Sequence, residues 1–192
     1  MGNKYANHSV KTADQKLVAE VMRRARRVAF VSRPQNGYVV VYDQEVDELG
    51  TPAVVQVGAL LSKEIGVPVL CVLNYDDDIL CYWLFEQRKL IDEFNSRPDY
   101  FNEVKGTPAQ GGDVERLCTS LGTNAERAKV EELLRGKHLF AVDQHTELAK
   151  ELGLPSCSVG LGYDYVKDLV TAGEELEEDE YDLAPSQLIR TP

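Results

Sequence analysis

Between Val67 and Phe101, apolar and polar residues follow the two-residue period of β-strands. Three consecutive strands joined by tight turns are predicted, at about Val69–Asn74, Ile79–Glu86 and Lys89–Asn95. In the middle segment both alternate sets of positions are apolar, so we expect a central strand covered on both faces, with Trp83 buried beneath a helix. The third segment mixes apolar with acidic residues and is expected to be less thoroughly covered. Tight connections between successive strands predict an antiparallel sheet.

The residues before this stretch predict a helix, a hairpin and a second helix. Residues 1–11 look like a loose arm, and a helix with an apolar stripe at helical spacing is predicted from Thr12. The pair Asn36-Gly37 is typical of a type I′ hairpin turn, and residues 43–50 are interpreted as an acidic loop. Thr51-Pro52 is typical of a helix start and Gly66 of a left-handed helix end, which predicts a helix between them.

Beyond the strands, a long connection leads to three short helices. The connection spans residues 95–112, and its aromatic pair Tyr100-Phe101 is expected to pin it to the body of the protein. Each helix is followed by a glycine, and the helices are predicted at Asp113–Leu121, Thr123–Arg135 and Asp143–Leu152. Residues 158–163 suit either a last strand or an extended cover.

The predicted element order, α-β-β-α-β-β-β-α, indicates an α+β fold with a mostly antiparallel five-stranded sheet and a C-terminal helical segment. A chain of 192 residues suits a single core. We therefore expect a sheet domain over residues 12–104 and a helical segment over residues 112–165 that packs on the same core. Residues 174–192 are expected to form an acidic, mobile tail that is dispensable for folding.

Two resemblances bear on this architecture. Over residues 12–121 the element order resembles the roadblock, longin and profilin-like folds, in which helices enclose a five-stranded sheet. At the level of sequence, NGYVVVYDQE at Asn36–Glu45 and LCVLNYDDDILCYWLFEQRKLIDEFNSRPDYF at Leu70–Phe101 are similar to an uncharacterised family of bacterial proteins. That family shares an NG-W/Y-V-x-V-Y-D stretch, a D-x-D turn and a D-x-[FY]-x-S-x-P-x-[YF] ending, and the similarity extends to Pro155. The resemblance implies a bacterial protein and assigns no activity.

The negative net charge of the protein excludes some classes of binding partner. A formal net charge of −11 argues against a nucleic-acid or anionic-membrane binder, because both reward positive charge. Residues 174–182 hold seven acidic side chains and no basic one, whereas residues 1–27 hold seven basic side chains against two acidic ones. An acidic block is typical of a solvated tail; the alternatives are that it folds back on the basic first helix or mimics an anionic ligand.

Cysteine usage and the apolar pattern bear on the compartment. The four cysteines form no C-x-x-C pair and show no metal-ligand spacing. Neither an N-terminal apolar run nor an apolar segment of roughly 20 residues occurs, so neither a signal peptide nor a membrane span is predicted. We expect a cytoplasmic protein in a reducing setting, without a cofactor.

Two acidic stretches provide the candidate site residues. The candidates for protein binding come from the predicted aspartate turn and the acidic loop, and they are Asp76, Asp77, Asp78, Asp43, Asp47 and Glu48. A carboxylate triplet also suits a divalent cation when further oxygens converge, which makes Asp76, Asp78 and Asp92 the candidate metal ligands. The alternative is a plain hairpin turn that keeps a sheet edge soluble.

The other chemistry-bearing residues form no recognised motif. The three histidines are expected to have surface or packing roles. Asp143, His145 and Cys157 would be the materials of a thiol site only if the fold brought them together. The stretch Gly160-x-Gly162 is too short for a phosphate-binding loop.

The leading hypothesis is a non-enzymatic cytoplasmic module that binds another protein. The acidic charge favours a basic partner, and neutralisation of a basic bacterial toxin is one concrete form. One alternative is a small metal-dependent hydrolase that uses the aspartate cluster. Another is a small-ligand sensor whose pocket lies between the central strand and the helical segment. A homodimer is compatible with the sequence.

Overall fold

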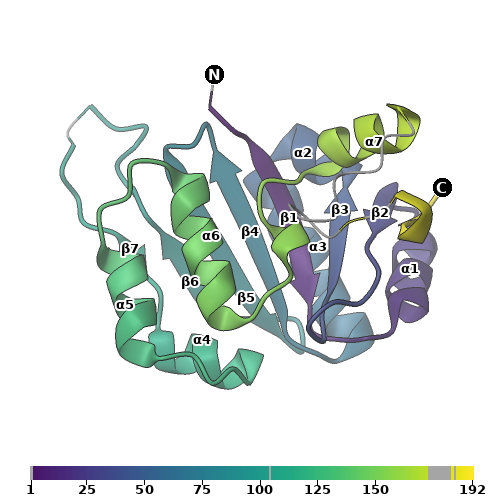
Figure 1. The fold of residues 1–192 in the computed structure, drawn as a ribbon, viewed down its shortest axis with the longest axis horizontal. Helices are drawn as coiled ribbons and strands as arrows, with labels where there is room; N and C mark the ends of the chain where they lie inside the picture. The colour runs from purple at the N-terminus through teal and green to yellow at the C-terminus, as the bar shows by residue number, and fades with distance from the viewer. Residues whose placement is uncertain (1, 104, 173–182, 184) are drawn as a thin grey trace.

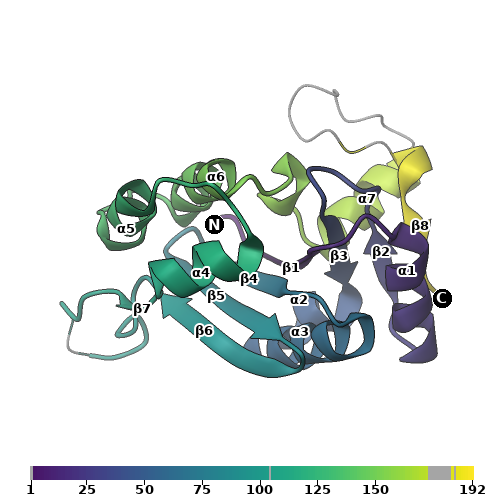
Figure 2. The same ribbon diagram turned by 90° about the horizontal axis from the view of Figure 1, so that it is seen from below.

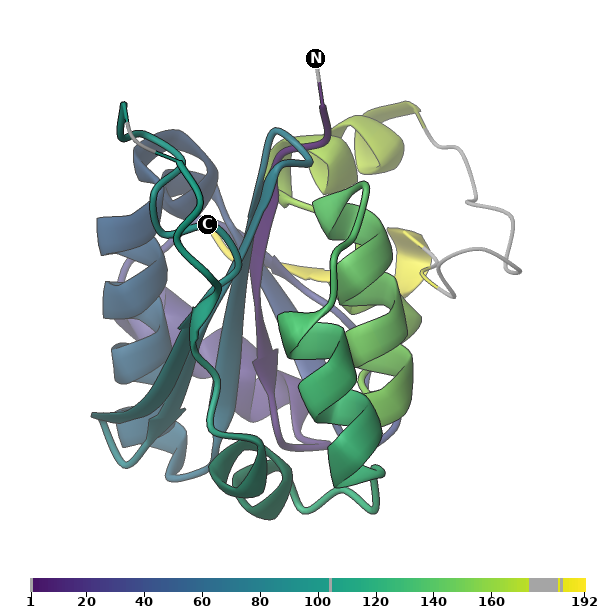
Figure 3. The ribbon, with the colours of Figure 1, turned by 90° about the vertical axis from the view of Figure 1, so that its left-hand side faces the viewer.

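The computed structural model describes residues 2–103, 105–172, 183 and 185–192. They form one antiparallel sheet with the strand order β7-β6-β5-β4-β1-β3-β2-β8, enclosed by helices on both faces (Figure 1 and Figure 3). The strands are β1 (Tyr5–Val10), β2 (Ala29–Val31), β3 (Val39–Asp43), β4 (Val69–Tyr75), β5 (Ile79–Glu86), β6 (Lys89–Asn95), β7 (Gln110–Gly111) and β8 (Ile189–Arg190). The predicted α+β class and antiparallel sheet are confirmed. The prediction of five strands is wrong because the sheet has eight, and the predicted element order is wrong because the described chain begins with a strand and ends with one.

The helices form the two outer layers. They are α1 (Gln15–Arg24), α2 (Gln44–Leu49), α3 (Thr51–Ile65), α4 (Val114–Leu121), α5 (Arg127–Arg135), α6 (Ala141–Leu152) and α7 (Tyr163–Ala172), with short 3-10 turns η1 (Ser156–Ser158) and η2 (Pro185–Gln187). Helices α1, α2 and α3 cover one face of the sheet, and α4 to α7 cover the other (Figure 2). No helix in the described part of the chain is long and apolar enough to cross a membrane.

The N-terminal segment is a central strand, so the expectation of a loose arm, and of a sheet that begins after residue 12, is wrong. Strand β1 lies between β3 and β4, and all its side chains are buried. Its polar residues find distant partners: Asn7 Nδ2 donates to the carbonyl oxygen of Ser158 at 2.8 Å, and His8 Nε2 donates to that of Val54 at 2.9 Å. Tertiary hydrogen bonds therefore allow a polar segment to be buried in the sheet.

The face under α1 and α3 carries one continuous apolar core. Trp83 of β5 is only 9% exposed within this core, which confirms its predicted burial. Helix α3 approaches the sheet closely at Gly58, where a Cβ atom would lie 2.2 Å from Cys71 Sγ. The opposite face of β5 packs its apolar side chains under α4, α5 and α6, so the prediction of a strand covered on both sides is also confirmed.

Two elements on the flanks differ from expectation. The acidic stretch after β3 is helix α2 and not a loop, because Asp43 caps it by accepting a hydrogen bond from the Val46 N–H at 3.1 Å. Residues 163–172 form helix α7, whose Tyr163 and Val166 are buried over β2 and β3. The sequence left this segment without a predicted helix.

The end of the chain is docked on the sheet. Strand β8 pairs with β2, with Ile189 opposite Val31. Thr191 is buried, and its Oγ1 donates to the Arg27 carbonyl oxygen at 2.6 Å and accepts from the Ala29 N–H at 2.8 Å. The expectation of a mobile tail is therefore wrong for residues 185–192, whereas residues 174–182 and 184 lie outside the described part of the chain.

Candidate functional site

The predicted aspartate turn connects β4 and β5 at one end of these two interior strands. We call residues Asp76–Asp78 the aspartate turn. Asp76 and Asp77 have φ angles of 56° and 58°, in the left-handed region that a type I′ turn requires. Aspartate tolerates this conformation better than most residues. The interpretation of the three aspartates as a hairpin turn is therefore confirmed.

The carboxylates of the aspartate turn hold the segments on either side of it. Asp76 Oδ1 accepts from the Gly2 N–H at 2.7 Å, and Asp77 Oδ2 accepts from the Asn3 N–H at 2.9 Å. Asp78 Oδ1 pairs with Arg97 Nη1 at 2.7 Å, and its Oδ2 accepts from the Tyr100 hydroxyl at 3.0 Å. Asp76 and Asp78 nevertheless remain exposed to solvent. The aspartate turn therefore fixes the N-terminal residues and the segment after β6, and two of its carboxylates still face solvent.

Exposed apolar side chains flank the aspartate turn on both faces of the sheet. We call this set the rim, and its members are Tyr75, Phe101, Leu139 and Phe140. Phe101 is 77% exposed and Leu139 83%, the two most exposed large apolar side chains of the described residues. The rings of Tyr75 and Phe101 lie edge to face with centroids 5.6 Å apart. Of the pair predicted to pin the connection to the body of the protein, Tyr100 packs against the core, whereas Phe101 contacts Tyr75 of the rim and remains exposed.

The two halves of the rim are tied to the turn from opposite sides. Tyr75 continues the alternate positions of β4 that face α3, whereas Leu139 and Phe140 precede α6 on the other face. The Ala141 N–H donates to the Asp77 carbonyl oxygen at 2.7 Å and so holds the second half beside the turn. The arrangement places apolar surface around a charged centre.

A cleft of about 880 Å³ opens beside the rim, between residues 96–100 and 105–109 on one side and residues 135–144 on the other, and Leu139 of the rim lines it. We call it the loop cleft. The loop that forms one wall closes on itself, because Asp99 Oδ2 accepts from the Thr107 N–H at 2.7 Å and Lys105 Nζ donates to the Asp99 carbonyl oxygen at 3.1 Å. The hydrogen bond from Thr107 lowers the pKa of the Asp99 carboxyl group. Opposite this wall stand the side chains of Arg135, Lys137 and His138.

The acidic residues of α2 do not form a second exposed face. Asp43 is fully buried, where Arg27 Nε donates to its Oδ2 at 2.8 Å, so its assignment as an exposed binding residue is wrong. Asp47 is largely buried against α7 and accepts from the Asp164 N–H at 3.0 Å; burial raises its pKa to about 6. Glu48 is exposed and accepts from Gln44 Nε2 at 2.9 Å.

The candidate metal ligands Asp76, Asp78 and Asp92 are not brought together. Asp92 of β6 pairs with Leu84 of β5. Leu84 is six residues beyond Asp78, so Asp92 lies about 20 Å from the aspartate turn along the strand direction. Its carboxylate accepts instead from the Tyr82 hydroxyl at 2.7 Å. Among the described residues, no three His, Cys, Asp or Glu side chains converge as a metal site would require. The prediction that these three aspartates bind one metal ion is therefore wrong, because the strand register keeps Asp92 away from the turn.

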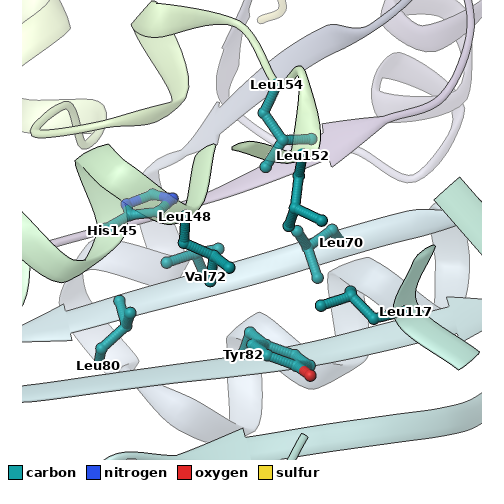
Figure 4. A pocket seen from close by; sticks show the side chains of 9 residues that line it. All are labelled: Leu70, Val72, Leu80, Tyr82, Leu117, His145, Leu148, Leu152 and Leu154. Atoms are coloured by element: carbon teal, nitrogen blue, oxygen red, sulfur yellow. The ribbon is translucent and has the colours of Figure 1, made fainter. Parts of the chain in front are cut away.

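The pocket expected between the central strand and the helices is a small closed cavity (Figure 4). Its volume is about 10 Å³, and leucine side chains form most of its lining. A volume of this size holds about one water molecule, so the cavity does not accommodate an organic ligand. The sensor hypothesis in that location is not supported by this geometry.

His145 borders the cavity, and it does not form a thiol site with Cys157. His145 Nδ1 lies 2.7 Å from the Tyr5 hydroxyl, whereas Cys157 Sγ lies 3.6 Å from Gln35 Oε1. His145 Nε2 is buried without a hydrogen-bond partner, and burial lowers the pKa of this histidine to about 3. These residues belong to separate packing environments.

Sequence reasoning found the aspartate turn and missed most of the rim. Leu139-Phe140 before a helix is as typical of a residue pair that packs on the first turn as of an exposed one. No local signal separates these outcomes. Comparison with known proteins adds no counterpart: no family model, no curated protein and no solved structure matches this chain.

Proposed function

We propose that this protein is a binding module for another protein and that the rim and the aspartate turn form its contact surface. The exposure of Phe101 and Leu139, at 77% and 83%, carries this proposal. Clustered exposed apolar side chains that are edged by polar groups are typical of protein interaction sites. Aromatic residues in such clusters supply much of the binding free energy.

The charges around the rim favour a specific orientation of the partner. Asp76 and Asp78 present carboxylates between the two apolar halves, and Lys4 lies over the Tyr75 ring at 5.8 Å from its centroid. A partner with a basic group facing the turn and apolar side chains on either side would complement this pattern. The net charge of −11 would also steer a basic partner towards the protein at low salt.

An enzymatic role has less support from the geometry. The carboxylates that were candidates for metal-dependent hydrolysis lie along different parts of the sheet or serve as hydrogen-bond acceptors within the chain. We therefore propose recognition, rather than hydrolysis, as the function of the aspartate turn.

The test compares two leucines of similar chemistry. The tagged protein is used to capture partners from an extract of its host, and the partner that is recovered is purified for direct affinity measurement. Leu139→Ser should weaken binding at least tenfold, because the leucine lies at the proposed interface. The matched control is Leu90→Ser, since Leu90 is 44% exposed on β6, away from the rim.

The Asp76→Asn/Asp78→Asn double variant should slow association at low salt and leave the dissociation rate nearly unchanged. Sedimentation of the purified protein separates self-association from binding to a different protein. Equal losses for the two leucine variants, or no partner recovered by the wild-type protein, would contradict the proposal.

A further inference from the structure

We infer that the loop cleft is a binding site for a small molecule that carries an oxyanion, either a phosphate or a carboxylate group. This site differs from the proposed protein-binding rim, although Leu139 and the loop that begins at residue 96 contribute to both. The inference comes from the way in which the acidic and basic side chains of the cleft are used.

The three carboxylates that line the cleft are engaged in hydrogen bonds within the chain. Asp77 accepts from the Asn3 N–H and from Asn74 Nδ2, at 2.9 Å each. Asp78 accepts from Arg97 and Tyr100, and Asp99 accepts from the Thr107 N–H. The carboxylate oxygens therefore already accept hydrogen bonds from donors of the protein itself, which compensate their negative charge.

The basic side chains of the cleft are less fully compensated. Within the described part of the chain, Lys137 has neither a hydrogen bond nor an ion pair, and it is exposed. Lys105 donates to backbone carbonyl oxygens, which leave its charge without a counter-ion. Arg135 Nη2 donates to the Gly111 carbonyl oxygen at 2.8 Å while its Nε pairs with Glu131. An anion between these walls would gain charge-assisted contacts that the chain itself does not provide.

His138 adds a directional group to this wall. Its Nε2 lies 3.0 Å from the Leu133 carbonyl oxygen, which only accepts, so Nε2 carries the hydrogen. Nδ1 is then left as the second polar position of the ring.

The size of the cleft and the charge of the chain limit the ligand. A volume of about 880 Å³ lies within the usual range of small-molecule sites. The net charge of −11 repels an anion at long range, so affinity must come from short-range contacts with Lys105, Arg135 and Lys137. A compact ligand with one concentrated anionic group meets this requirement.

The experiment uses nitrogen-15 labelled full-length protein and two probes, pyrophosphate and tricarballylate, titrated at constant ionic strength with sodium chloride. Saturable shifts of the amide resonances should appear at residues 105–107 and 136–138, and the tighter probe identifies the preferred oxyanion. Lys137→Gln should weaken binding by roughly tenfold, the size expected for loss of one charge-assisted contact. The control is Lys89→Gln, at an exposed position on β6 outside the cleft, which should bind as the wild-type protein does.

Several results would overturn the inference. These are no saturable shift with either probe, equal weakening by the two lysine variants, or shifts confined to the arginines of α1. The Phe101→Ser variant, at a rim residue that does not line the cleft, separates this result from the proposed function. It should still bind the probe when it no longer binds the protein partner, and loss of partner binding alone leaves the oxyanion site standing.

Discussion

Large aromatic side chains occupy two opposite environments in this protein. Trp83 in the middle of β5 is 9% exposed, whereas Phe101, in the loop after β6, is 77% exposed. The burial of Trp83 removes apolar surface from water and stabilises the fold. Phe101 provides little such stabilisation, so its apolar surface is available for recognition. The comparison separates the layers around the sheet, where burial provides stability, from the rim, where we propose that the partner binds.

Polar groups follow the same division. The interior contains ionisable groups in unfavourable environments, with His145 neutral at the closed cavity and Asp47 poorly solvated under α7. The aspartate turn, by contrast, keeps its carboxylates hydrogen-bonded and in contact with solvent. Substitutions in the interior should therefore change the free energy of unfolding, and substitutions at the rim should not.

The largest effect is expected from deletion of residues 5–10. This deletion removes β1 from between β3 and β4 and exposes two strand edges in the centre of the sheet. We expect no cooperative thermal transition and loss of the near-ultraviolet circular dichroism signal. A folded deletion variant that melts within a few degrees of the wild-type protein would show that β1 is not part of the stabilising interior.

Truncation of the buried tryptophan should have the next largest effect. Trp83→Ala should lower the free energy of unfolding by about 3–5 kcal/mol, because it removes a large side chain from a packed core. Urea denaturation measures the change, with Phe101→Ala as the matched exposed control. The expected distinction fails if the two variants are equally stable or if native Trp83 fluorescence is already red-shifted.

Acid should destabilise the interior through His145. Its folded pKa of about 3 lies below the ordinary value of 6.5, so the unfolded chain binds more protons between these values and stability falls as the pH falls through this window. The loss from this group should reach about 3 kcal/mol at pH 4. Denaturation of wild type and His145→Gln at a series of pH values isolates the histidine, and parallel pH profiles would contradict its role.

Asp47 should have an effect of opposite sign. Its folded pKa of about 6 lies above the ordinary value of 3.8, so the folded protein binds more protons in this window and stability falls as the pH rises through it. Asp47→Asn should therefore stabilise the protein by up to about 3 kcal/mol at pH 8, with little difference by pH 3. A pH-independent change would assign the effect to packing against α7 rather than to charge.

The smallest effect on stability is expected at the rim. The Phe101→Ser/Leu139→Ser double variant should change the free energy of unfolding by less than about 0.5 kcal/mol, as is usual for exposed positions. The same variant should lose the captured partner. Urea denaturation and the capture assay are measured on one preparation. A loss of several kcal/mol would mean that the rim belongs to the folding core and would remove the contrast with Trp83.

The sequence predicted the elements whose signals are local. Helix α3 follows from Thr51-Pro52 at one end and Gly66 at the other, and the β4–β5 hairpin follows from alternation and an aspartate turn. Both depend on backbone preferences and side-chain periods that act within a few residues. The buried placement of Trp83 also followed, because an apolar strand on both faces requires cover on both sides.

Only the tertiary structure decided the roles of β1 and of the rim. Asn7 Nδ2 and His8 Nε2 are buried against acceptors far along the chain, the carbonyl oxygens of Ser158 and Val54. Likewise, Leu139 is exposed because the Ala141–Asp77 hydrogen bond sets how the chain enters α6. Nothing within a few residues of these positions encodes such contacts. The sequence by itself therefore determined the local elements, whereas long-range hydrogen bonding and packing decided which surfaces remained free to bind.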